Sequence, residues 1–142
     1  MTYLADVNVW LAMTYVAHVH YPVATAWFDE VSADQAALCR MTQSGLLRLL
    51  SNPKVMGVDV LTAADAWTTY DKLRNDVRVT FATEPANIEP HWRDATRYHH
   101  TGPNFWTDAY LTAFAAAKDL TLVTFDRAFT RQRQARVRLL KS

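Results

Sequence analysis

The segment that most restricts the fold runs from residue 106 to Asp126. An alanine-rich stretch at 106–118 is followed, after one intervening residue, by the apolar run "LTLVTF" at 120–125. Small side chains let a helix pack closely against a sheet, and a short apolar run with β-branched residues is typical of a buried strand. A helix joined to a buried strand by so short a connection is the repeating unit of a parallel sheet covered by helices.

The rest of the chain alternates in the same way. Helices are predicted from residue 7 to about 13–16, from Pro22, from Met41 or Thr42 to about 50, from a capping box at Thr62, and around 88–95. Further strands are predicted at 3–6, 36–39, 77–82 and 137–140. This order indicates the α/β class, with a mainly parallel central sheet.

Length and composition fit one globular domain over residues 1–142, half of whose residues are hydrophobic. We expect no membrane association, because no apolar run approaches the roughly 18–20 residues of a transmembrane helix. Cys39 is the one cysteine, which rules out an internal disulfide and suits a cytoplasmic location. Its apolar sequence context predicts a buried thiol.

The charges are unevenly distributed. The residues after Asp126 include no acid and six basic residues, namely Arg127, Arg131, Arg133, Arg136, Arg138 and Lys141. The body of the chain is correspondingly acidic, although the formal net charge is only +1. The basic tail fits either a solvated edge strand or a phosphate-contacting strip, and the sequence does not separate the two.

Three aspartates fall where strands end or helices begin. Asp6 follows the first strand, Asp126 follows "LTLVTF", and Asp108 opens the alanine-rich helix. Each alone fits an ordinary helix cap. In parallel sheets, however, sites form beyond the carboxyl ends of the strands, so the three carboxylates are expected to converge there. A cluster of oxygen ligands favours Mg²⁺ or Mn²⁺ over zinc, and such ions support phosphodiester hydrolysis.

Three stretches of the chain resemble the PIN-domain family, and within it the VapC-type toxins of bacterial toxin–antitoxin pairs. They are "LADVNVWLA", "TQSGLLRLLSNPKVMG" and "WTDAYLTAFAAAKDLTLVTFDRAF". The resemblance implies a PIN-like three-layer α/β/α sandwich in which Asp6, Asp108 and Asp126 bind the metal and carry the catalysis. It also implies a Mg²⁺- or Mn²⁺-dependent endoribonuclease acting on transfer or ribosomal RNA. The implied partners are a cognate VapB-type antitoxin and a second copy in a homodimer.

Gln43 departs from the family pattern, which usually has a glutamate near the start of the third helix. An amide oxygen can hold a water molecule but binds metal only weakly. The chain is therefore either a working nuclease with a neutral fourth ligand or a weakened PIN-like module that binds RNA or protein. We favour the nuclease, because the other three acids are present.

The weaker signals concern residues around the acids. Asn8 and Thr124 are candidate hydrogen-bond partners of the metal ligands. Candidate RNA-binding residues are Arg127, Arg131, Arg133 and Trp106. Core packing is predicted for the tryptophans on apolar helical stripes, at positions Trp10, Trp27, Trp67 and Trp92.

The five histidines show no recognised zinc spacing. His18 and His20 fall in a predicted loop with no link to chemistry, and His99 and His100 are expected at a turn or on the surface. A phosphoryl-transfer fold that also places an aspartate after its first strand is disfavoured, since residue 8 is an asparagine rather than a second acid.

Overall fold

Five short strands form one parallel sheet in the computed structural model, which describes residues 1–97 and 102–141. The order of the strands across the sheet is β3-β2-β1-β4-β5, and every neighbouring pair is parallel. The strands are β1 (Tyr3–Ala5), β2 (Ala36–Leu38), β3 (Val79–Phe81), β4 (Thr121–Thr124) and β5 (Arg136–Leu139). The predicted parallel sheet is confirmed.

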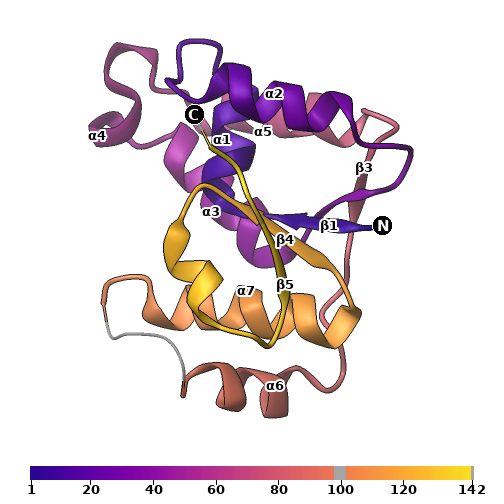
Figure 1. Ribbon diagram of the computed structural model, residues 1–142. Coiled ribbons are helices and arrows are strands. Elements are labelled where there is room, and N and C mark those ends of the chain that lie inside the picture. Colours follow the sequence, from indigo (N-terminus) through magenta and orange to yellow (C-terminus); the bar gives the residue numbers. More distant parts are fainter. Residues whose placement is uncertain (98–101, 142) are drawn as a thin grey trace.

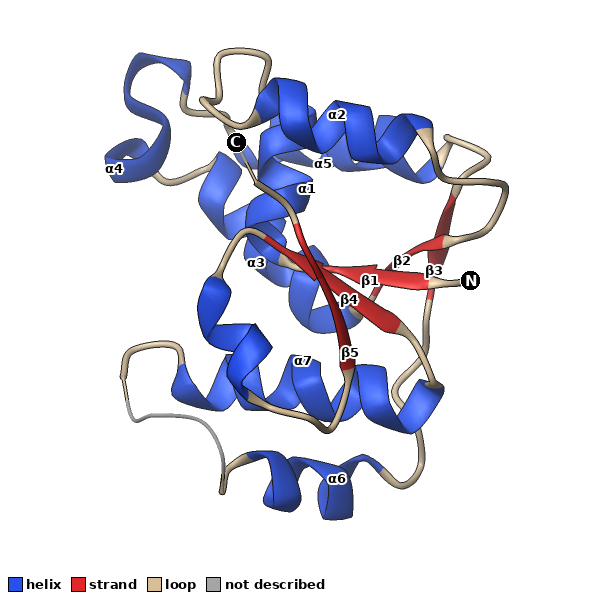
Figure 2. Cartoon of the chain, viewed as in Figure 1, coloured by secondary structure: helices blue, strands red, loops and turns tan. Residues whose placement is uncertain are grey.

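Helices cover both faces of this sheet (Figure 1). They are α1 (Val7–Thr14), α2 (Tyr21–Asp29), α3 (Arg40–Leu50), α4 (Pro53–Met56), α5 (Ala63–Arg74), α6 (Ile88–Ala95) and α7 (Phe105–Lys118). Figure 2 shows α1, α2, α3 and α5 on one side of the strands and α6 and α7 on the other. The predicted three-layer sandwich is therefore confirmed. The short helix α4 and the 3₁₀ turns η1 (Gly57–Asp59) and η2 (Arg127–Arg131) were not predicted.

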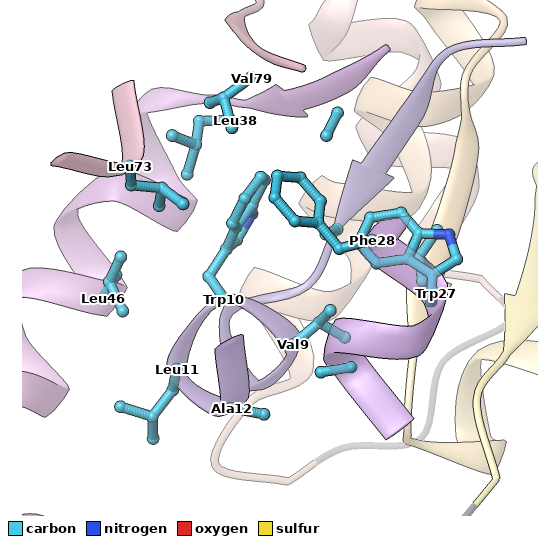
Figure 3. Packing of buried hydrophobic residues seen from close by; sticks show 14 of the residues in the cluster. Val9, Trp10, Leu11, Ala12, Trp27, Phe28, Leu38, Leu46, Leu73 and Val79 are labelled. Carbon is cyan, nitrogen blue, oxygen red and sulfur yellow. The ribbon is translucent and has the colours of Figure 1, made fainter. Parts of the chain in front are cut away.

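Successive residues of the central strands feed two hydrophobic cores. Ala5 and Val123 face the layer of α1, α2, α3 and α5, whereas Leu4 and Leu122 face α7. This alternation is the two-residue period of a strand covered on both faces. Larger side chains complete the first core, and Figure 3 shows Trp10 of α1 among Phe28, Leu38 and Leu73, which come from α2, β2 and α5.

The strand register aligns the carboxyl ends of the strands. Ala5 of β1 lies opposite Val123 of β4, and Leu38 of β2 lies opposite Phe81 of β3. Asp6 therefore emerges at the same edge of the sheet as the residues that follow β2, β3 and β4. This edge is where α/β proteins place their sites.

Helix α3 packs closely against the start of α1 at Gly45. A Cβ atom at Gly45 would lie 2.7 Å from Cγ2 of Val7, closer than real Cβ contacts come. Glycine at this position thus allows α3 to approach the residue next to Asp6.

The Cys39 thiol is fully buried, and Trp10 and Trp27 lie in the core, as predicted. The prediction for Trp67 is wrong, because 49% of its surface is exposed. The inward face of α5 is formed instead by Ala66, Tyr70 and Leu73, and Trp67 packs edge-on against Tyr70.

The basic tail contributes an edge strand, β5. Arg136 pairs with Asp119 and Arg138 pairs with Glu30, so these two charges are engaged with acids of the same chain. The solvated-edge interpretation fits these two residues. Within residues 1–97 and 102–141, no helix is both long enough and apolar enough to cross a bilayer.

Candidate active site

Asp6 links the end of β1 to the start of α1. Its Oδ1 accepts a hydrogen bond from the Val7 amide at 2.7 Å, which caps the helix, and its backbone amide donates to Val123 of β4. The side chain is almost entirely buried. Burial raises the pKa of the Asp6 carboxyl, and the negative charge of Asp126 raises it further, while the hydrogen bonds to the carboxylate oppose these two effects.

Thr124 joins Asp6 to the chain segment of Asp126. Its hydroxyl donates to Oδ2 of Asp6 at 3.2 Å and accepts the Asp126 amide at 3.0 Å. Thr124 is fully buried, so the hydroxyl is held in one place by packing. The residue that the sequence marked as a supporting group thus contacts the first acid directly and positions the backbone of the second.

Asp126 caps the 3₁₀ turn η2 through a hydrogen bond from the Ala128 amide to its Oδ1 at 2.9 Å. Unlike Asp6, it is exposed. Capping thus occupies one oxygen of each of these two carboxylates.

Asp108 lies half-buried in the first turn of α7. Burial raises the pKa of its carboxyl to about 7, with further contributions from the charges of Asp6 and Asp126. Asp108 is therefore within electrostatic range of both other acids. The structure brings the three aspartates to one edge of the sheet, as their positions in the sequence predicted.

The donor chemistry of this acidic edge suits a hard cation. All three side chains offer oxygen, they repel one another, and no ion pair among the described residues includes any of them. In residues 1–97 and 102–141, however, no group of three His, Cys, Asp or Glu side chains is arranged as a ready-made metal-ligand cluster. Holding an ion then requires side-chain rotation or bridging water. With such a rearrangement, the negative charge and the oxygen donors of the three aspartates fit a divalent cation.

Gln43 is buried in the first part of α3, and its amide oxygen already has a partner. Nη1 of Arg40 donates to Oε1 of Gln43 at 2.5 Å. The oxygen that was expected to hold a metal-bound water is thus bound to a guanidinium group.

The other predicted site residues lie on the surface. Asn8 is exposed on α1, and among the described residues no hydrogen bond involves its side chain. Arg127 follows Asp126 directly and is exposed, whereas Arg131 and Arg133 line a pocket together with Asp94 of α6. Trp106 is 65% exposed, and its ring lies edge-on to Trp92 of α6.

Two histidines that the sequence left without a role lie close to the acidic edge. The His20 ring stacks on Phe125 with centroids 4.5 Å apart, and Phe125 is the residue directly before Asp126. Nδ1 of His18 accepts a hydrogen bond from the backbone amide of His20, and the two imidazole rings pack against each other. No motif marked this contact, because it depends on the loop between α1 and α2 folding back over the end of β4. His99 and His100 lie outside the described residues.

Comparisons with known proteins identify the family of the chain. A model of the PIN domain matches residues 3–134. The chain is 40% identical to ribonuclease VapC41 of Mycobacterium tuberculosis, over 96% of this chain and 97% of that protein.

Solved structures with similar folds include toxin–antitoxin proteins. VapBC2 from Rickettsia felis, bound to a DNA fragment from its promoter, superposes with a TM-score of 0.70 at 14% identity over 99% of this chain and 100% of that one. VapC20 of Mycobacterium tuberculosis, a sarcin-ricin loop cleaving toxin, gives a TM-score of 0.68 at 17% identity over 91% of this chain and 93% of that one. At these identities the two structures support the fold.

Proposed function

The chain belongs to the PIN-domain family and is a relative of the VapC ribonucleases, and we propose that it is the toxin of a toxin–antitoxin pair. Its activity is the hydrolysis of RNA phosphodiester bonds by a nuclease domain that spans residues 1–142. The substrate is a transfer or ribosomal RNA. The proposed partners are a VapB-type antitoxin, which silences the enzyme, and a second copy of the chain in a homodimer.

The observation that carries this proposal is the gathering of three carboxylates at one edge of the sheet, where Thr124 links Asp6 to the Asp126 segment and Asp108 lies in the first turn of α7. Because like charges disfavour one another's ionised form, a chain gains no stability from gathering three acids in this way. Such an arrangement is expected where the protein binds a cation. Similarity to VapC41 along nearly the whole chain supports the ribonuclease assignment.

Asp6, Asp108 and Asp126 would hold Mg²⁺ or Mn²⁺ at this edge. When bound, the ion supplies a Lewis acid that lowers the pKa of a water molecule and offsets negative charge on the phosphate. Thr124 orients Asp6 by donating to its Oδ2, and the Val7 amide fixes the other oxygen. Burial and the charges of Asp6 and Asp126 raise the pKa of the Asp108 carboxyl to about 7 before any ion binds.

The second candidate function is a PIN-like module that binds RNA or protein without cutting it. The observation that favours it is the hydrogen bond from Arg40 to the Gln43 amide oxygen. Because this oxygen already has a partner, no group among the described residues takes the place of the fourth acid that the family usually has. The proposed nuclease site rests on the three aspartates and does not need Gln43 as a ligand.

One experiment separates these functions. The purified chain, free of antitoxin, is incubated with total RNA in the presence of Mg²⁺, Mn²⁺ or a chelator, beside the Asp6→Asn variant. The matched control is Asp71→Asn, the same substitution at an exposed position on α5. We expect defined RNA fragments from the wild type and from the control, and none from Asp6→Asn or with chelator. Identical RNA patterns from the wild type and Asp6→Asn, with binding retained by both, would establish the non-cutting module instead.

A further inference from the structure

Two arginines from different helices lie against one aromatic ring at the end of β3. The Cζ atom of Arg40, the first residue of α3, is 4.9 Å from the centroid of the Phe81 ring. The Cζ atom of Arg74, the last residue of α5, is 5.4 Å from the same centroid. Contact with a ring face restrains a guanidinium group without neutralising it.

The polar partners of these arginines are uncharged. Arg40 donates to the Gln43 amide oxygen, and Arg74 donates to the Tyr70 hydroxyl at 3.2 Å. Neither takes part in an ion pair among the described residues, whereas Arg78, Arg93, Arg97, Arg136 and Arg138 all do. Both are exposed. Their donors therefore remain available to an anion.

Phe81, which holds the pair, lies at the edge of the sheet that carries the aspartates. Phe81 ends β3 in register with Leu38 of β2, and β2 lies beside β1, which ends next to Asp6. Two strand spacings, about 10 Å, separate the ends of β3 and β1. A nucleic-acid strand cut at the aspartates passes over negatively charged side chains, so the phosphates on either side need cationic partners nearby.

The amide at position 43 preserves this positive charge. A glutamate there would place a carboxylate beside the Arg40 guanidinium and form a charge-assisted ion pair, as such groups do at this distance. Glutamine accepts the same hydrogen bond but leaves the net charge of Arg40 in place. The amide at position 43 thus leaves Arg40 with a net positive charge that can attract an anion.

We propose that Arg40 and Arg74, held against Phe81, bind a backbone phosphate of the RNA next to the bond that is cut, and that Gln43 positions Arg40 for this contact. The proposal rests on the proposed ribonuclease function. It assigns RNA binding to residues at the β2–β3 side of the edge, in addition to the basic tail that follows Asp126.

The test measures affinity for a short, fluorescently labelled single-stranded RNA by anisotropy across a salt titration. Chelator is present throughout, so that binding is measured without cleavage. The variants are Arg40→Gln, Arg74→Gln, the double variant and Gln43→Glu. The matched control is Arg48→Gln, which removes an exposed arginine from the same helix as Arg40. Thermal unfolding of each variant verifies that the fold is retained.

Each single arginine variant is expected to lower the slope of log affinity against log salt by about 0.7, and the double variant by about twice as much. Gln43→Glu is expected to weaken binding like Arg40→Gln, and to add little further loss in the Arg40→Gln background. The control is expected to match the wild type. Should position 43 serve the metal instead, Gln43→Glu will leave binding in chelator unchanged and raise the cleavage rate, which overturns its assigned role.

The remaining outcomes separate this proposal from the function on which it rests. A wild type that cleaves RNA while both arginine variants bind it with unchanged affinity and slope overturns the phosphate site alone. A wild type that neither binds nor cleaves RNA overturns both. Variants that bind RNA normally but no longer bind a co-expressed antitoxin assign the surface to a protein partner and overturn the phosphate site.

Discussion

The Thr124 hydroxyl donates to Oδ2 of Asp6 across 118 positions of sequence, at 3.2 Å and with full burial. The hydroxyl oxygen of Thr124 also accepts a hydrogen bond from the backbone amide of Asp126. One hydroxyl therefore fixes a carboxylate at the end of β1 and the backbone at the end of β4.

Thr124→Val tests this relationship, since valine has nearly the same shape but no hydroxyl. We expect ribonuclease activity to fall by about 10–100-fold, the usual effect of removing a group that orients a ligand. The pKa of Asp6 is expected to rise further, because one of the hydrogen bonds that lower it is lost. Steady-state cleavage of an RNA substrate measures the first effect. Thr121→Val, at the opposite end of the same strand, is the control, and an equal loss in both variants would contradict the assigned role.

The pH dependence of activity follows from Asp108. Its pKa is raised to about 7, so below that pH the carboxyl holds a proton. This proton competes with a cation for the carboxylate oxygens. We expect the affinity for Mn²⁺ and the cleavage rate to increase as the pH rises through 7. Calorimetric titration with Mn²⁺ on both sides of this pH measures the effect, and equal affinities below and above it would contradict the account.

Stability in metal-free buffer should change in the opposite sense. The folded pKa of Asp108 lies above its ordinary value of 3.8, so the folded state keeps a proton that the unfolded chain releases. The resulting stability is present below about pH 3.8 and is lost as the pH rises through 7. Asp108→Asn cannot ionise and should therefore melt a few degrees higher than the wild type at pH 8, with the difference vanishing in acid. Asp71→Asn should show no such pH-dependent gain.

Gly45→Ala addresses the close packing of α3 on α1. The added Cβ would meet Cγ2 of Val7 at 2.7 Å, and overpacking of this kind costs about 1–3 kcal/mol, partly offset by the better helix propensity of alanine. Urea unfolding should show a net loss of stability. Val7→Ala should cost less in the Gly45→Ala background than in the wild type, because it removes the clashing atom. Gly102→Ala serves as the control, since no heavy atom of the described residues lies within 4 Å of its added Cβ. Additive effects of the two substitutions would contradict the packing argument.

The sequence indicated much of this architecture because its signals are local. Asp6 and Asp126 follow apolar strands directly, and the rule that parallel strands end at one edge brings them together. Trp67 was misassigned since it is one position away from Ala66, and a shift of one residue rotates a side chain by about 100° around a helix.

Other parts of the site depend on contacts between distant segments. The stacking of His20 on Phe125 and the contact of Arg40 with Phe81 each join elements far apart in the chain. No spacing or motif encodes such contacts, because they follow from strand order and from how the loops pack. The engagement of Gln43 by Arg40 is local, three residues apart, but the sequence alone gave no reason to prefer it over a bound water.

The central claim is that Asp6, Asp108 and Asp126 act as one site. It is tested most directly by comparing kcat/KM for RNA cleavage in Asp6→Asn, in Asp108→Asn and in the double variant, all in the same metal-containing buffer. The effects of residues that act as a unit are non-additive. Each single substitution should therefore reduce kcat/KM by at least about 100-fold, and kcat/KM of the double variant should be no lower than that of the less active single variant. A single variant that cleaves RNA at the wild-type rate, or a double variant whose loss equals the product of the two single losses, would contradict the claim.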